Sequence, residues 1–206
     1  MRKAKRMNEE LDLSGEFIAA RKALTLDHRK RLKASGVPSF LVDVSGFVGV
    51  ARIVATENKF YFAPDGVEAF IVPARGDPDA PAPDIDHPGP LDATLYGDTI
   101  DLVAFDLDRP EWWATLTGLA PTLGYAVFAD TETPTQVWRG PLAWLQARCT
   151  GIVPLAADDI ELRAILHRLP GGIQAQDIEH GRQLERVLTR PLPAPQIFVG
   201  IDKAAA

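Results

Sequence analysis

The segment over residues 73–92 limits what this chain can fold into more than any other part of it. It carries six prolines, at positions 73, 78, 81, 83, 88 and 90, and five aspartates, at positions 77, 79, 84, 86 and 92. Because proline removes a backbone donor and aspartate favours turns, neither a long helix nor a central strand can run through this segment. We therefore expect an acidic surface loop or linker over residues 74–98.

Short aromatic and β-branched runs precede this loop, between residues 37 and 73. The runs are residues 40–44, 47–54, 59–63 and 67–72. Residues of these types favour strands, and Asp65-Gly66 readily supplies the positive φ that a tight hairpin turn needs. The pattern predicts a four-strand antiparallel β-meander.

Residues 1–36 are expected to form a basic helical arm. A short apolar pattern that starts at Ser14 predicts one helix. Asp27 can cap a second helix, which stops at Gly36.

The net charge of −6 is unevenly distributed along the chain. Residues 1–33 carry +5, residues 34–137 carry −12 and residues 138–206 carry +1. The candidate contacts on the arm are Arg21, Lys22, Arg29, Lys30, Arg31 and Lys33. They could bind nucleic-acid phosphates, dock on an acidic centre within or between molecules, or form a solvated surface.

Two elements are expected directly after the acidic loop. Residues 99–105 predict a strand. Asp108 can then cap a short helix, with Pro110 in its first turn and Trp112 and Trp113 further along. A second helix is predicted over residues 141–148.

In the last third of the chain, sequence patterns typical of strands alternate with patterns typical of helices. Strands are predicted at residues 152–155, 173–176 and 197–199, and the helices between them are capped by Asp158 and Asp177. Strand–helix–strand–helix–strand is typical of parallel pairing through right-handed crossovers. We expect an α+β protein with an N-terminal antiparallel β-meander and a C-terminal α/β (βαβαβ) unit over residues 99–206. Residues 37–206 are either one compact domain or two subdomains.

Composition excludes several kinds of chemistry. No serine follows Ser45, and no lysine lies between Lys59 and Lys203. No serine has the flanking glycines of a G-x-S-x-G nucleophile, and no Gly-Lys pair exists for a phosphate-binding G-x-x-x-x-G-K-[ST] loop. No apolar run approaches the roughly 20 residues of a membrane helix, and no secretory signal is present. The single cysteine, Cys149, cannot form an internal disulfide, so we expect a cytoplasmic protein without a cofactor.

The strand that ends in Asp106-Leu107-Asp108 resembles the first motif of the haloacid-dehalogenase-like phosphotransferases. In that family one aspartate attacks phosphorus and the next acts as acid or base, with Mg²⁺ masking the charge. Asp158 follows another apolar strand, as the family's last motif would. Arg109 departs from the family's Gly-Thr, and the downstream lysine is missing. The competing interpretation makes Asp108 and Asp158 helix caps.

A second cluster of chemically active residues lies at the start of the last predicted helix. Asp177, Glu179 and His180 lie together there, and His167 precedes them. Asp177 and His180 are candidate ligands for a divalent metal. The usual paired-histidine and paired-cysteine spacings are absent, and carboxylates at a helix start also complement the helix dipole.

Cys149 could act as a thiol nucleophile together with His167 or His180. Reactive thiolates favour helix N-termini, whereas Cys149 follows the C-terminal end of the helix predicted over residues 141–148. A buried, inert cysteine is the competing interpretation.

Four tryptophans lie within 33 residues: Trp112, Trp113, Trp138 and Trp144. Tryptophan is common both in cores and at interfaces. Trp112 and Trp113 cannot face the same way on a helix, so one of them is expected to be exposed as a partner contact.

A set of short sequences resembles a group of uncharacterised bacterial proteins associated with prophage-like or mobile regions. The matching stretches are residues 100–105, 113–114, 123–124, 137–145 and 171–173. The resemblance covers roughly residues 38–200, and it implies no activity and no site residues.

Three functions remain open from the sequence. We expect a non-enzymatic interaction or accessory protein that binds a protein partner or a second copy and does not contact membranes. The first alternative is a metal-dependent hydrolase or nuclease that uses Asp101, Asp106, Asp108 or the cluster around His180. The second is a nucleic-acid-binding accessory factor that uses the basic arm.

Overall fold

The computed structural model describes residues 11–44, 46–75, 99–124, 133–169 and 171–191. Most of the acidic, proline-rich loop and the strand predicted at residues 197–199 lie outside the described residues. Within them, no helix is both long enough and apolar enough to cross a membrane.

A closed five-stranded barrel forms the N-terminal half. Its strands are β1 (Gly49–Thr56), β2 (Lys59–Phe62), β3 (Val67–Arg75), β4 (Thr99–Phe105) and β5 (Trp113–Thr115), in the order β1-β2-β5-β4-β3. All neighbouring strands are antiparallel except β2 and β5, which pair in parallel. The strand regions at 47–54, 59–63, 67–72 and 99–105 are confirmed, but the predicted meander is wrong.

The connection after β2 explains why the meander does not form. Ile53 of β1 is paired with Phe62 of β2 and also with Val67 of β3, so the chain crosses from one edge of β1 to the other. Gly66 makes this crossing possible because a Cβ there would lie 2.2 Å from the Ile53 carbonyl oxygen. The Asp65-Gly66 turn therefore separates β2 from β3 instead of joining them as a hairpin.

Two further expectations for this half are wrong. Residues 40–44 form a short π-helix, η1 (Phe40–Val44), and not a strand. The helix predicted after Asp108 is replaced by β5, in which Trp113 pairs with Phe105 of β4. Trp112, directly before β5, and Trp113, its first residue, pack against different core clusters, and both are half-buried.

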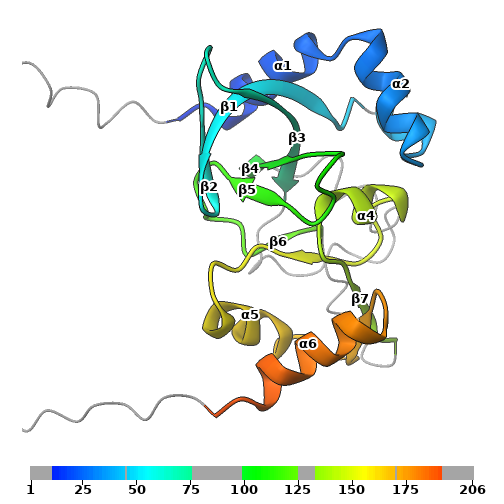
Figure 1. Ribbon diagram of the computed structural model, residues 1–206, viewed down its shortest axis with the longest axis vertical. Helices are drawn as coiled ribbons and strands as arrows, with labels where there is room; N and C mark the ends of the chain where they lie inside the picture. The colour runs from blue at the N-terminus through cyan, green and yellow to red at the C-terminus, as the bar shows by residue number, and fades with distance from the viewer. Residues whose placement is uncertain (1–10, 45, 76–98, 125–132, 170, 192–206) are drawn as a thin grey trace, which may run out of the picture.

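The N-terminal arm folds onto the barrel as α1 (Leu13–Ala23) and α2 (Leu26–Ala34). Phe17 and Ala20 of α1 join a buried cluster with barrel residues such as Ile53. Asp27 is not the cap of α2: Thr25 is, and its hydroxyl accepts a hydrogen bond from the His28 N–H. Figure 1 shows both helices, in blue, lying over one end of the barrel.

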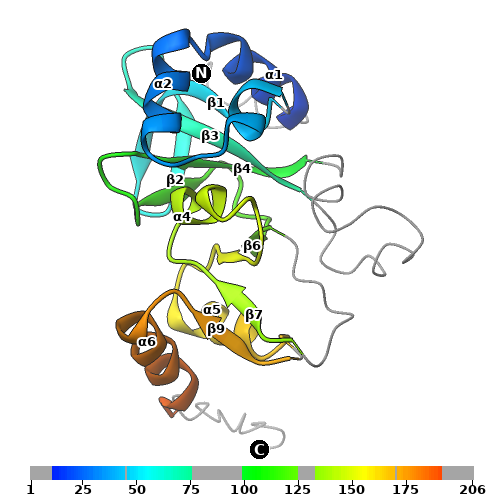
Figure 2. The same cartoon turned by 90° about the vertical axis from the view of Figure 1, so that its right-hand side faces the viewer.

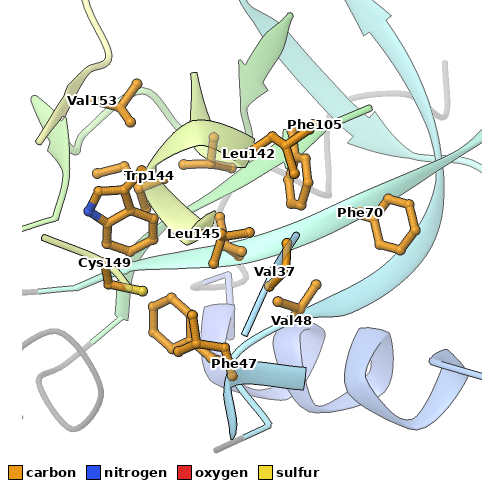
Figure 3. Packing of buried hydrophobic residues seen from close by; sticks show 14 of the residues in the cluster. Val37, Phe47, Val48, Phe70, Phe105, Leu142, Trp144, Leu145, Cys149 and Val153 are labelled. Atoms are coloured by element: carbon orange, nitrogen blue, oxygen red, sulfur yellow. The ribbon is translucent and has the colours of Figure 1, made fainter. Parts of the chain in front are cut away.

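A second buried cluster joins the barrel to α4 (Pro141–Gln146), the helix predicted over residues 141–148. Trp144 belongs to this cluster, in which Phe47, Leu145 and Cys149 lie near it (Figure 3). Cluster members come from α2, η1, β1, β3, β4 and α4, so both faces of the barrel wall are covered.

The C-terminal region consists of short strands and two capped helices. The elements are β6 (Thr122–Leu123), β7 (Thr135–Val137), β8 (Val153–Pro154), α5 (Asp159–Leu166), β9 (Ile173–Ala175) and α6 (Ile178–Thr189). Asp158 and Asp177 are confirmed as the caps of α5 and α6. In Figure 2, α5 and α6 lie at the opposite end of the molecule from α1 and α2, with α4 and β6 between.

The predicted βαβαβ unit is wrong in its strand pairing. β8 pairs antiparallel with β6, whereas β9 pairs in parallel with β7. β7 was not expected as a strand, and Val137 at its end also bridges Ile152 in parallel. The sequence pattern predicts that the strands at residues 152–155 and 173–176 pair with each other. In the structure, β7 lies between Ile152 and β9.

Candidate functional site

Arg139 is the centre of the candidate site, because parallel pairing brings it to the start of α6. Val137, the last residue of β7, is paired with Ala175, the last residue of β9, and Arg139 and Asp177 each lie two residues beyond the end of these strands. Both terminal nitrogens of Arg139 donate to the Asp177 carboxylate, with Nη2–Oδ1 at 3.0 Å. Arg139 Nε also lies 3.6 Å from the Glu111 carboxylate, so the guanidinium of this side chain, which is 16% exposed, faces two acids.

His180 lies beside this ion pair, on the first turn of α6, and is only 5% exposed. Its Nδ1 is 3.3 Å from the Gln176 backbone nitrogen, which can only donate. Nδ1 is therefore the acceptor, and the proton of the neutral ring is assigned to Nε2. Burial and the charge of Arg139 lower the pKa of His180, although Asp177 and Glu111 oppose this shift.

Cavities lie on both sides of Arg139 and Glu111. The His180 cavity has a volume of about 260 Å³. It is lined by Glu111, Trp138, Arg139, Pro154, Leu162, His180, Gln183, Leu184 and Val187. The Gln146 cavity has a volume of about 410 Å³ and lies against α4 and Ser35. We call the two together the Arg139 cleft.

The ionisable groups of the cleft predict a loss of stability in acid. The hydrogen bonds from Arg139 lower the pKa of Asp177 to about 2, and the pKa of His180 is also lowered. In both cases the unfolded chain takes up the proton first, so acid favours unfolding. The free energy of unfolding should fall below pH 6.5 through His180 and again between pH 3.8 and about 2 through Asp177.

Urea titrations at about pH 7.5 and about pH 5.5 test the first of these steps. His180→Gln should lose less stability than the wild type over this interval, because the glutamine has no proton to bind. An equal loss in both proteins would show that His180 does not titrate in this way.

Asp106 and Asp108 do not form an open acidic pair. Asp106 accepts hydrogen bonds from the Asp108 backbone N–H at 3.0 Å and from Arg109 Nε at 3.0 Å. Burial raises the pKa of Asp106, but these bonds and the nearby arginines outweigh it, so the pKa is lowered overall. Asp108 is highly exposed, with its carboxylate 3.8 Å from Arg31.

Asp158 and Asp177 have structural partners as well. Asp158 accepts from the backbone N–H groups of Ile160 and Glu161, at 2.8 and 2.9 Å. No group of three or more His, Cys, Asp or Glu side chains that could hold a metal is found in the part of the chain that the structure describes. Asp177 and His180 are adjacent, but the carboxylate is bonded to Arg139 and to the His180 N–H.

Asp101 is fully buried and fastens a loop. Its carboxylate accepts four backbone N–H groups, from Leu102, Thr117, Gly118 and Leu119, at 2.6–3.0 Å. Lys59 donates to the Thr117 carbonyl of the same loop. The structure therefore gives Asp101 a role in holding the loop between β5 and β6.

The basic residues of α2 mostly face acids of the same molecule. Arg29 and Lys33 both lie close to Asp43, at 3.7 and 2.5 Å, and Arg31 lies 3.8 Å from Glu68. Lys30 pairs with Asp27 on the helix itself. Arg21 and Lys22, on α1, are exposed.

Cys149 is buried beneath α4, and burial raises the pKa of its thiol. We expect no reaction with a soluble aromatic disulfide reagent in the native protein and rapid reaction after unfolding in urea, because only the thiolate attacks. Absorbance of the released thiolate measures both rates. Labelling of the native protein at the rate of the unfolded protein would contradict the buried placement of Cys149.

His167, one of the two histidines named as a possible partner of the Cys149 thiol, is exposed at the end of α5.

The half-buried tryptophans offer less surface than expected. Trp112 lies with its ring 4.8 Å from the Arg109 guanidinium, and Trp113 packs on the cluster around Phe105. Trp138 lines the His180 cavity and donates to the Thr150 carbonyl at 2.7 Å.

The sequence pointed to Asp177 and His180 but not to Arg139 or Glu111. Arg139 follows β7, which has no clear strand pattern, and Glu111 lies in a connection that was expected to be helical. Comparison with protein-family models, with curated proteins and with solved structures finds no match. The resemblance to uncharacterised bacterial proteins stays a prediction.

Proposed function

We propose that the protein is a non-enzymatic interaction protein and that the Arg139 cleft receives its partner. The observation that carries this proposal is the pair of cavities on either side of Arg139: the His180 cavity has mainly apolar walls, and the Gln146 cavity has polar and apolar walls in similar measure. Binding sites generally combine these features.

The contacts of the carboxylates support binding over catalysis. Asp101 holds a loop, Asp106 binds Arg109, and Asp158 caps α5. An acid or base must be able to exchange a proton with a substrate, and a metal ligand needs free lone pairs. These side chains direct theirs to backbone N–H groups or to arginine.

Glu111 is the part of the cleft best able to respond to a partner. Its side chain is 68% exposed and lies 3.6 Å from Arg139, whereas Asp177 binds the same guanidinium through two oxygens. Exposed ion pairs contribute about 0–1 kcal/mol, so the Glu111 carboxylate can exchange its contact with Arg139 for a hydrogen bond from a partner at little cost.

A fragment screen by nuclear magnetic resonance tests where binding occurs. We expect fragments to shift the signals of residues that line the cleft. Val187→Trp should block the His180 cavity alone, and Ala143→Trp should block the Gln146 cavity alone, so each variant is the control for the other. Fragment shifts that both variants leave intact would place the binding surface elsewhere.

Metal titration tests the enzymatic alternative. We expect calorimetry with Mg²⁺, Mn²⁺ or Zn²⁺ to show no tight site, and aryl phosphate esters and plasmid DNA to remain intact. The double variant Asp106→Asn, Asp108→Asn should behave like the wild type in these assays. Metal-dependent hydrolysis that this double variant abolishes would overturn the proposed function.

A further inference from the structure

We propose that the His180 cavity binds a neutral amide group carried on an apolar body. The amide carbonyl oxygen would accept a hydrogen bond from His180 Nε2–H, and the amide N–H would donate to Glu111. This inference rests on the proposed function, since it names the chemistry that one side of the Arg139 cleft recognises.

The donor is the nitrogen of His180 that the fold leaves unused. The ring is 5% exposed, and its Nδ1 is occupied by the Gln176 backbone N–H. Within the described residues no group is hydrogen-bonded to Nε2, and His180 lines the cavity. Nε2 is not among the buried polar atoms without a partner in the described residues, so it reaches solvent and can donate to a ligand that brings an acceptor.

The acceptor is the Glu111 carboxylate at the edge of the same cavity. It lies 3.6 Å from Arg139 Nε, a distance at which an ion pair forms but a good hydrogen bond does not. Its oxygens therefore remain able to accept. One donor and one acceptor facing a single cavity match the C=O and N–H of an amide, whereas a carboxylate offers no donor at neutral pH.

The charge around the cavity disfavours anions. Arg139 is the cation there, and Asp177, Glu111 and Glu179 all act on it. With His180 neutral, these four ionised groups sum to a negative charge. An anionic ligand would meet this charge in a half-enclosed site, where screening by water is reduced.

The remaining walls are apolar and limit the ligand's size. Pro154, Leu162, Leu184 and Val187 line the cavity together with the polar groups. Its volume of about 260 Å³ equals the liquid volume of roughly nine water molecules. An amide with one ring or one branched chain fits this space.

Three probes of one shape test the chemistry: benzamide, N,N-dimethylbenzamide and benzoate. Titrations followed through the Trp138 indole signal and the His180 ring signals should give the tightest binding for benzamide. Dimethylbenzamide, which has no N–H, should bind several-fold more weakly, and benzoate should bind weakest. N-acetylleucine amide is added as a peptide-like amide. If it binds more tightly than benzamide, a partner polypeptide is the source of the amide; the reverse order indicates a free small molecule.

Two variants separate this inference from the proposed function. His180→Phe keeps the ring but removes the donor, and should weaken benzamide about tenfold. Val187→Trp leaves His180 in place and should abolish binding by filling the cavity, which keeps the test valid if His180→Phe does not fold. Benzoate binding as tightly as benzamide, or unchanged affinity in folded His180→Phe, would overturn the inference. Fragments that bind only in the Gln146 cavity would overturn it while leaving the proposed function in place.

Discussion

Replacing Asp101 by asparagine is expected to lower the free energy of unfolding by about 3–5 kcal/mol. The buried carboxylate accepts four backbone N–H groups, three of them from residues 117–119. Each carboxylate oxygen accepts two of these N–H groups, and asparagine replaces one oxygen by an NH₂ group that cannot accept, so two N–H groups lose this partner. Hydrogen bonds to a charged group contribute about 1.5–3 kcal/mol each. The exchange of one carboxylate oxygen for an NH₂ group is therefore expected to lower the free energy of unfolding strongly.

Urea unfolding followed by circular dichroism measures this loss. Asp108→Asn is the matched control, because the same chemical change at an exposed aspartate should alter stability by less than about 0.5 kcal/mol. If Asp101→Asn were as mild as the control, the carboxylate would not be what holds the loop.

Local signals in the sequence predict the positions of helices and strands better than they predict which strands pair. Asp158 and Asp177 were identified as caps because an aspartate before an apolar helical pattern satisfies free N–H groups whatever the rest of the fold does. β5 was missed for the same reason: Asp108 and Pro110 give a good local start for a helix. The pairing of Trp113 with Phe105 overrides that signal, and no local pattern reports it.

The candidate site was only half predictable. Asp177 and His180 are neighbours in sequence, so their proximity needs no tertiary information. Arg139 reaches Asp177 only because β7 and β9 pair in parallel with Val137 opposite Ala175. A register shift of one residue would turn the side chains to the opposite face. The sequence contains the residues of the cleft, but the register that assembles them is a property of the fold.

The second large effect is expected at Trp144, which joins the barrel to α4. Its ring is fully buried, its centroid lies 5.7 Å from that of Phe47, and its Nε1–H donates to the Gly151 carbonyl at 3.1 Å (Figure 3). Trp144→Ala should lower the free energy of unfolding by about 3–5 kcal/mol, since it removes buried contacts and leaves a cavity.

Trp144→Phe separates packing from hydrogen bonding. It keeps an aromatic ring but leaves the Gly151 carbonyl without its donor, so we expect a loss of about 1–3 kcal/mol, smaller than that of the alanine variant. Urea transitions followed by circular dichroism and by labelling of Cys149 should coincide in the wild type and in both variants, because Trp144 and Cys149 belong to the core cluster that also contains barrel residues. If Cys149 became reactive well before the loss of secondary structure, the region around α4 would unfold separately from the barrel, and residues 37–206 would be two subdomains instead of one compact domain.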